Sequence, residues 1–194
     1  MQPKDLDDLS RFLREIQNES DRGLALVGAS VIDDKLRATI KSFLVECKAS
    51  SKLLDDPSAP LTTFSSRIDV CLSLGLIDRF EYDEVTLIRK VRNAFAHGLH
   101  GTTFQTEPIP GLCSTLKSPL PDGADYPTAS PRFRYTNSVI SIVTRLYYRP
   151  EWVAKERRVS KEWVTPDQVG WRSVEESIPP EGVPALVMVK DKPS

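Results

Sequence analysis

The chain has 194 residues, 40% of them hydrophobic, so it can hold one ordinary domain with a buried core and some additional segments. Its 26 Lys and Arg residues nearly balance 27 Asp and Glu residues, and the formal net charge is -1. This balance disfavours direct DNA binding as the main activity, because DNA-binding proteins draw much of their affinity from neutralising phosphates with basic side chains.

The ends and the apolar runs of the chain indicate where it resides. Residues 1–8 are polar and acidic, unlike a signal peptide. The longest apolar runs fall well short of the ~20 residues needed to cross a bilayer. We therefore expect a cytoplasmic protein without membrane association.

Apolar residues spaced three and four apart predict helices in the first half of the chain. The first is expected from Asp5 to Gln17. The second is expected to follow an N-cap at Ser20 and to reach about Lys48. Small residues on this second helix allow another helix to approach closely: Ala25, Gly28 and Ala29.

Two further helices are predicted after a connection from Ser50 to Pro60. Thr62 or Thr63 caps the third, which ends near Gly75. Asp78 caps the fourth, whose apolar stripe includes Glu84 and continues to Ala96 before Gly98 stops it.

The second half of the chain is richer in proline, with twelve of the fifteen prolines after residue 97. From Gly98 to Pro131 no period is visible, so we expect a long loop that acts as a functional cover or a mobile insert. A last helix is predicted from Asn137 to about Tyr148. The fold class is therefore all-α, a helical bundle over residues 4–150 with a Pro-rich insert at 98–131. Residues 151–194 form an irregular C-terminal tail, in which 184–189 resemble a strand or a partner-pairing segment.

The segment with the most chemical potential is the end of the fourth helix. At 100° per residue, Arg89, Asn93 and His97 form one polar ridge, and Arg92 lies at the edge of the apolar stripe. Arg can hold a phosphate with two hydrogen bonds, and His can transfer a proton near neutral pH. Together with Asn93, these residues suffice for metal-independent RNA cleavage.

Arg92 and His97 are five residues apart, about 140° around a regular helix. They can therefore meet at one small ligand only if the helix unwinds at 96–98, or if two copies of the chain combine their residues. The second option links any activity to a homodimer.

The same residues also have a structural interpretation. An Arg beside an apolar stripe often extends to a carboxylate, and a His in a last turn often caps carbonyl groups. We expect no cofactor and no metal site, since His97 and His100 are the only histidines. The three cysteines form no CxxC pair and are expected to be buried, reduced thiols: Cys47, Cys71 and Cys113.

Four blocks of the sequence resemble the mannitol operon repressor family. They are ESDRG (residues 19–23), PL with FSSRID (60–61 and 64–69), LGLI (74–77) and IRKVRNAFAH (88–97). The resemblance covers roughly residues 10–100. It implies an all-helical fold and a role in transcriptional regulation without a DNA-binding motif, through a protein partner.

A shorter motif, Arg92 and His97 separated by four residues, is similar to the motif of HEPN domains. Those domains are small helical bundles that often dimerise, and many are metal-independent endoribonucleases of toxin or defence systems. The resemblance implies that Arg92 would hold phosphate, His97 would be the acid or base, and Asn93 would assist. RNA and an antitoxin would then be partners.

A further group of charged residues lies in the repressor-like blocks. Asp21, Arg22, Arg67 and Asp69 are expected either to form a buried ion-pair network or to line a polar pocket near Arg92. With Arg89, the residues Asp21, Arg22 and Arg67 are our candidates for binding.

Overall fold

The computed structural model describes residues 3–56, 58–123 and 126–163. The chain divides into two compact units, Met1–Val159 and Ser160–Ser194. The predicted strand-like segment at 184–189 lies outside the described residues. All regular elements of the described part are helices, which confirms the all-α fold class.

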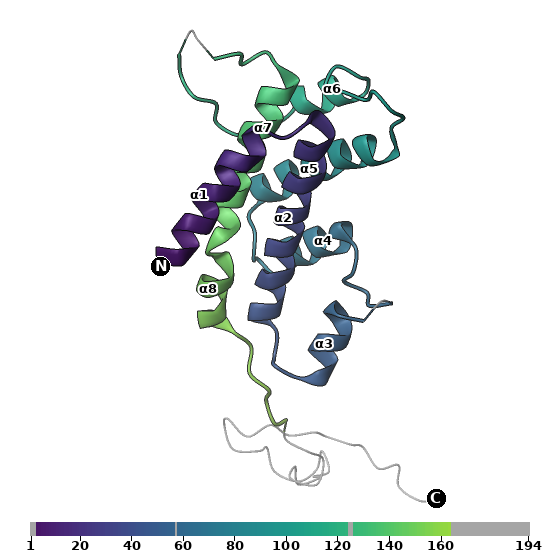
Figure 1. The fold of residues 1–194 in the computed structure, drawn as a ribbon. Helices are drawn as coiled ribbons and strands as arrows, with labels where there is room; N and C mark the ends of the chain where they lie inside the picture. Colours follow the sequence, from purple (N-terminus) through teal and green to yellow (C-terminus); the bar gives the residue numbers. More distant parts are fainter. Residues whose placement is uncertain (1–2, 57, 124–125, 164–194) are drawn as a thin grey trace, which may run out of the picture. The chain divides into compact units, whose positions relative to one another are not determined.

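The helices follow one another with short and long connections (Figure 1). Their bounds are α1 Pro3–Gln17, α2 Asp21–Phe43, α3 Lys48–Leu54, α4 Phe64–Ser73, α5 Arg79–His97, α6 Ile109–Ser114, α7 Pro131–Tyr147, α8 Arg149–Val153 and a 3-10 turn at Ala154–Glu156. In the described residues, no helix is long and apolar enough to span a bilayer.

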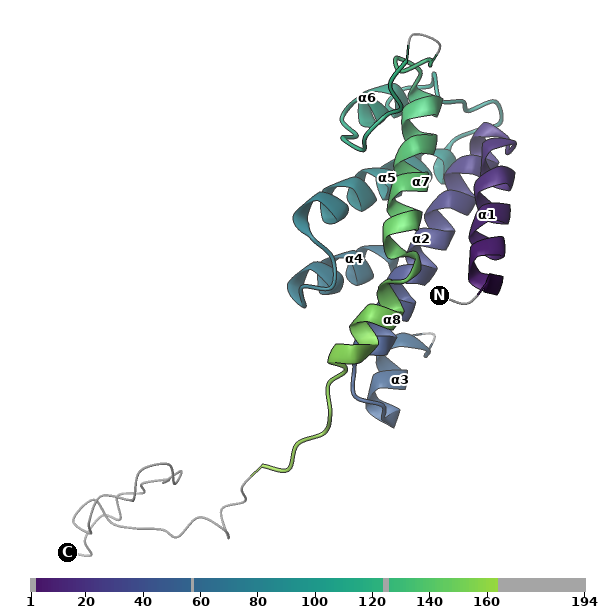
Figure 2. The ribbon, with the colours of Figure 1, turned by 90° about the vertical axis from the view of Figure 1, so that its left-hand side faces the viewer.

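Helix α2 is the central element of the first unit. It contacts α4, α5, α7 and α8, and α1 lies against both α2 and α7. Figure 2 shows α4 and α5 on one side of α2 and α7, with α1 on the other. The core is built from fully buried side chains of α2, α5 and α7, among them Leu24, Ile32, Leu36, Ile88, Phe95 and Ile142.

The small residues of α2 allow the close approach that the sequence predicts. A Cβ atom added to Gly28 would lie only 2.8 Å from Cγ1 of Val139 on α7. The predicted N-caps are also confirmed. Ser20 accepts a hydrogen bond from the Gly23 amide, Thr63 from the Ser66 amide and Asp78 from the Glu81 amide.

The predicted end of the second helix is wrong. Helix α2 stops at Phe43 instead of about Lys48, and α3 occupies much of the expected connection. The terminal carbonyls of α2 accept hydrogen bonds from distant residues: Ser42 from Arg157 Nε at 3.1 Å and Phe43 from the Arg158 amide at 2.8 Å. A partner about 115 residues away leaves no local signal for where the helix ends.

The second half is more ordered than its proline content predicts. The expectation of a loop without structure from Gly98 to Pro131 is wrong, because α6 lies within it. Helix α7 begins at Pro131, six residues before the predicted Asn137, since Ser130 caps it and Pro131 suits the first turn. The predicted boundary at residue 150 falls inside α8, which packs on α2.

Candidate functional site

The first turn of α2 forms hydrogen bonds with the segment that directly follows α5. Arg22 Nη2 donates hydrogen bonds to the carbonyl oxygens of Gly98, at 2.8 Å, and Leu99, at 3.0 Å. The Thr102 hydroxyl also donates to the Leu99 carbonyl, at 2.8 Å. A Cβ atom at Gly98 would lie 2.4 Å from Oγ1 of Thr102 and 2.9 Å from the Ala94 carbonyl oxygen, so this close arrangement requires glycine.

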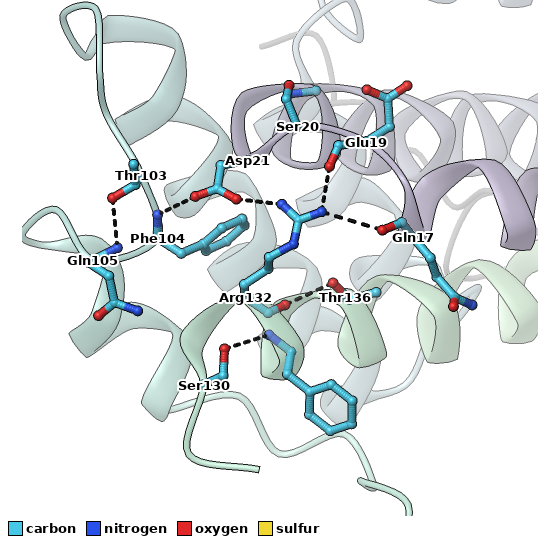
Figure 3. Close-up of polar contacts among 12 residues, drawn as sticks. Gln17, Glu19, Ser20, Asp21, Thr103, Phe104, Gln105, Ser130, Arg132 and Thr136 are labelled. Carbon is cyan, nitrogen blue, oxygen red and sulfur yellow. Dashed lines mark hydrogen bonds and ion pairs between the residues drawn. The ribbon is translucent and has the colours of Figure 1, made fainter. Parts of the chain in front are cut away.

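The neighbouring residue, Asp21, forms hydrogen bonds with the same segment at Phe104 and with the start of α7 (Figure 3). One carboxylate oxygen accepts a hydrogen bond from the Phe104 amide at 3.0 Å. The other accepts from Nη1 of Arg132 at 2.5 Å. Arg132 also donates to the Glu19 carbonyl at 2.5 Å. Asp21 therefore joins the start of α2, the segment after α5 and the start of α7.

The Phe104 side chain completes the attachment. It is 1% exposed, and its ring centroid lies 4.9 Å from that of Phe95 and 5.3 Å from that of Tyr135. Aromatic pairs at these separations attract one another beyond the effect of burial alone. The 98–104 loop is thus held at both ends, by Arg22 at its start and by Asp21 and the aromatic cluster at its end.

The 98–104 loop exposes an apolar side chain to solvent. Leu99 is 86% exposed, although its carbonyl oxygen is hydrogen-bonded by Arg22 and Thr102. Beside it lies a hollow of about 420 Å³, lined by residues 94, 97–102 and 106–109. We call the Leu99 side chain and this hollow the Leu99 surface. Its lining includes both histidines, His97 and His100, and one charged residue, Glu107.

The structure does not bring the three predicted catalytic residues to one point within the chain. Helix α5 continues unbroken to His97, so Arg92 and His97 stay on different faces. His97 lines the hollow and Arg92 does not. Arg92 is exposed, and its Nη1 donates to Oδ1 of the adjacent Asn93 at 3.0 Å.

The predicted network of Asp21, Arg22, Arg67 and Asp69 does not form. Asp21 pairs with Arg132, and Arg22 holds the two carbonyls described above. Arg67 pairs with Asp33 on α2 at 2.7 Å and donates to the Leu61 carbonyl. Asp69 accepts a hydrogen bond from the Tyr82 hydroxyl. Apart from the Leu61 carbonyl, the partners of these four side chains lie outside the four blocks, where the sequence pattern could not identify them.

Burial affects two further charged groups, the Asp33 carboxyl and the Arg89 guanidinium. Burial raises the pKa of the Asp33 carboxyl, and the Arg67 guanidinium opposes that rise. Arg89 on α5 is partly buried, and its Nε has no hydrogen-bond partner within the described residues. Neither Arg67 nor Arg89 lines the hollow of the Leu99 surface. Of the predicted residues, His97 lines it, and Asp21 and Arg22 hold its loop in place.

Sequence reasoning missed two residues that hold the segment between α5 and α7. Arg132 carries no sequence signal beyond its place after the Ser-Pro cap. Glu84 does carry one, because a carboxylate inside an apolar stripe needs a partner. It is 1% exposed and accepts hydrogen bonds from the amides of Lys117 and Ser118 and from the Ser118 hydroxyl, at 2.6, 3.2 and 2.5 Å.

The cysteines divide into two buried and one exposed. Burial raises the pKa of the Cys71 and Cys113 thiols to about 12. Cys47 is exposed, so its predicted burial is wrong, and hydrogen bonding with the Ser50 hydroxyl lowers the pKa of its thiol. Among the described residues, no three His, Cys, Asp or Glu side chains gather in a way that would hold a metal ion.

Comparisons with known proteins yield one structural match. No family model matches the sequence, and no curated protein matches it. Among solved structures, the chain is similar to one in the X-ray structure of the MtlR-HPr complex from Escherichia coli, at 21% sequence identity. That match covers 75% of this chain and 98% of the other, with a TM-score of 0.49.

Proposed function

We propose that this chain is a regulator-like protein that acts by binding another protein through the Leu99 surface, without a DNA-binding motif of its own. The observation that carries the proposal is a leucine that is 86% exposed on a loop held at both ends. An exposed leucine on a freely moving loop is common. A leucine whose backbone is fixed by hydrogen bonds to charged side chains is instead held in one place, where a partner protein can contact it.

Two physical effects favour protein binding at such a place. A loop whose backbone is already fixed in position loses little conformational freedom when a partner docks, which raises affinity. Binding energy also concentrates in a few apolar anchors at the centre of an interface, next to a concave surface. Leu99 and the adjacent hollow of about 420 Å³ offer both features.

The sequence resemblance to the mannitol operon repressor family supports the same proposal. The first of its four blocks, residues 19–23, supplies Asp21 and Arg22, which fasten the 98–104 loop. The last block, residues 88–97, ends where this loop begins. The resemblance therefore falls on residues that shape the Leu99 surface, and transcriptional regulation through a protein partner is the role that it implies.

The test is affinity isolation of the tagged full chain from the cells that express it, followed by titration with the purified partner. We compare the wild type with Leu99→Asp and with the control Leu74→Asp, since Leu74 is 41% exposed in the turn after α4. The proposal expects a defined partner that binds the wild type and the control, and binds Leu99→Asp at least about tenfold more weakly. Equal binding by all three proteins contradicts it.

One observation favours a second candidate function, metal-independent RNA cleavage. Arg92 is exposed, and within the described residues its guanidinium donates a hydrogen bond to its neighbour Asn93 alone, so it is open to a phosphate. Because α5 is unbroken, Arg92 would have to meet His97 of a second copy, which makes a homodimer a condition of this activity. RNA cleavage in EDTA by the wild type, lost in Arg92→Ala and His97→Ala, would support it. An intact RNA substrate after incubation with the dimeric wild type would refute it.

A further inference from the structure

We infer that the Leu99 surface takes a partner segment in which a cationic side chain, Lys or Arg, stands next to an apolar one. This inference rests on the proposed function and names the chemistry of its partner.

Helix α5 ends without the left-handed residue that usually closes a helix. Its C-cap, Gly98, has φ -69° and ψ 149°, an extended conformation. Turns with a left-handed cap return amide groups to the terminal carbonyls, and an extended cap does not. Within the described residues, no hydrogen bond from outside the helix reaches the carbonyl oxygens of residues 94–97.

We expect the open end of α5 to contribute negative charge beside the hollow. Unsatisfied terminal carbonyls place a partial negative charge at a helix C-terminus, where cations bind favourably. Ala94 and His97 of this last turn line the hollow, and the lining residue with a formal charge is Glu107, an exposed carboxylate. The nearby cation, Arg22, is outside the lining and is hydrogen-bonded to the carbonyls of Gly98 and Leu99, one and two residues beyond the helix.

The remaining polar lining agrees with a donor-rich occupant. The hydroxyl oxygens of Thr102 and Thr106 can each accept a hydrogen bond. A carboxylate in the same place would face Glu107 and the helix carbonyls, and like charges repel there. Charge complementarity thus selects a basic group over an acidic one.

Leu99 explains why the basic group should stand beside an apolar side chain. Lys and Arg carry methylene stems that lie along apolar surface while the charged head reaches a polar group. With the head toward Glu107, the stem and its apolar neighbour would cover Leu99. The pairing would bury the side chain that is 86% exposed in the free protein.

The experiment is an amide NMR titration of the full chain with two blocked tetrapeptides of sequence Ala-Arg-Leu-Ala and Ala-Glu-Leu-Ala. We expect the Arg peptide to shift the amide signals of His100, Gly101 and Thr102 in a saturable manner. The Glu peptide should not. In Glu107→Gln the affinity for the Arg peptide should fall about threefold to fivefold, the size of one exposed charge pair. The control Glu15→Gln, an exposed carboxylate on α1, should leave it unchanged.

Two outcomes would overturn the inference. One is equal binding of the Arg and Glu peptides, and the other is the absence of saturable shifts with either. The failure is separate from that of the proposed function. If Leu99→Asp weakens binding of the purified partner while Glu107→Gln leaves it unchanged, the interface stands and its preference for a basic group falls.

Discussion

Charged side chains cap the N-terminal end of α5, which we call its closed end. The C-terminal end, which we call its open end, has no such cap within the described residues. At the N-terminal end, Asp78 and Glu81 form a reciprocal capping box, and Glu81 also pairs with Arg149 at 2.6 Å while being 0% exposed. At the other end the cap is extended, and the next side chain, Leu99, is 86% exposed. One helix thus has charged groups that stabilise it at one end and an exposed apolar side chain at the other.

We expect the largest loss of stability from a substitution at the closed end of α5. Glu81→Ala removes half of the capping box and leaves Arg149 without its carboxylate, so the free energy of unfolding should fall by about 3 kcal/mol. Urea unfolding followed by circular dichroism measures this. The control is Arg79→Ala in an exposed pair with Asp83, where the loss should stay below about 1 kcal/mol. Equal losses in the two variants would remove the distinction between buried and exposed charge at this end.

The next effect concerns the attachment of the 98–104 loop. Asp21→Ala frees the Phe104 amide and leaves Arg132 unpaired, and should cost about 2 kcal/mol, the range for hydrogen bonds to charged groups. Each end of α5 has a buried thiol nearby that can report on it. Cys71 lies near Arg149 and Glu81, and Cys113 lies on α6 within the segment after α5.

These thiols test where the loosening occurs. Because both have a pKa of about 12, they are protonated at pH 8 and react only when their surroundings open. In a Cys47→Ser background, Asp21→Ala should speed maleimide labelling of Cys113 and leave Cys71 unchanged, as read by mass spectrometry. Parallel acceleration of both thiols would mean that the two ends of α5 open together.

A smaller loss is expected when the start of the loop is released. Arg22→Met removes two hydrogen bonds to the carbonyls of Gly98 and Leu99 and should cost about 1 kcal/mol. Hydrogen exchange of the amides of residues 99–102 should accelerate. Arg92→Met is the control, because Arg92 is exposed and its recorded hydrogen bond is to the adjacent Asn93. Unchanged exchange in Arg22→Met would show that the loop is held by other contacts.

The smallest effect on stability should come from the open end itself. Leu99→Ala should change the free energy of unfolding by less than about 0.5 kcal/mol, because little surface is buried there. Leu76, near the closed end, is 4% exposed, and Leu76→Ala should cost about 2–3 kcal/mol. Thermal or urea unfolding of the pair checks this contrast. A large loss for Leu99→Ala would mean that Leu99 is part of the core.

Local chemistry explains which parts of this structure the sequence could predict. The N-caps at Ser20, Thr63 and Asp78 and the apolar stripes follow from residues within one or two turns, so the sequence was sufficient. The end of α2 was not predictable, because its terminal carbonyls bond to Arg157 and Arg158. The helix within the Pro-rich segment was hidden for a related reason, since α6 is short and packs on α5 and α7.

The candidate site was predictable only in part. His97, Asp21 and Arg22 could be identified as candidates from their chemistry and from the four blocks of the family resemblance. Their grouping could not, because Asp21 finds its partners 83 and 111 residues away in Phe104 and Arg132. Leu99 could not be predicted as part of the site, because a leucine after a helix is common and the sequence does not reveal its exposure.

Photo-crosslinking from position 99 tests whether the Leu99 surface binds a partner protein. A benzoylphenylalanine residue replaces Leu99 in the full chain within living cells, and a second strain carries it at Leu74 as the control. We expect a discrete crosslink to a different protein from position 99 and none from position 74. No adduct from position 99, or an adduct only to a second copy of this chain, would contradict a partner-binding surface at the end of α5.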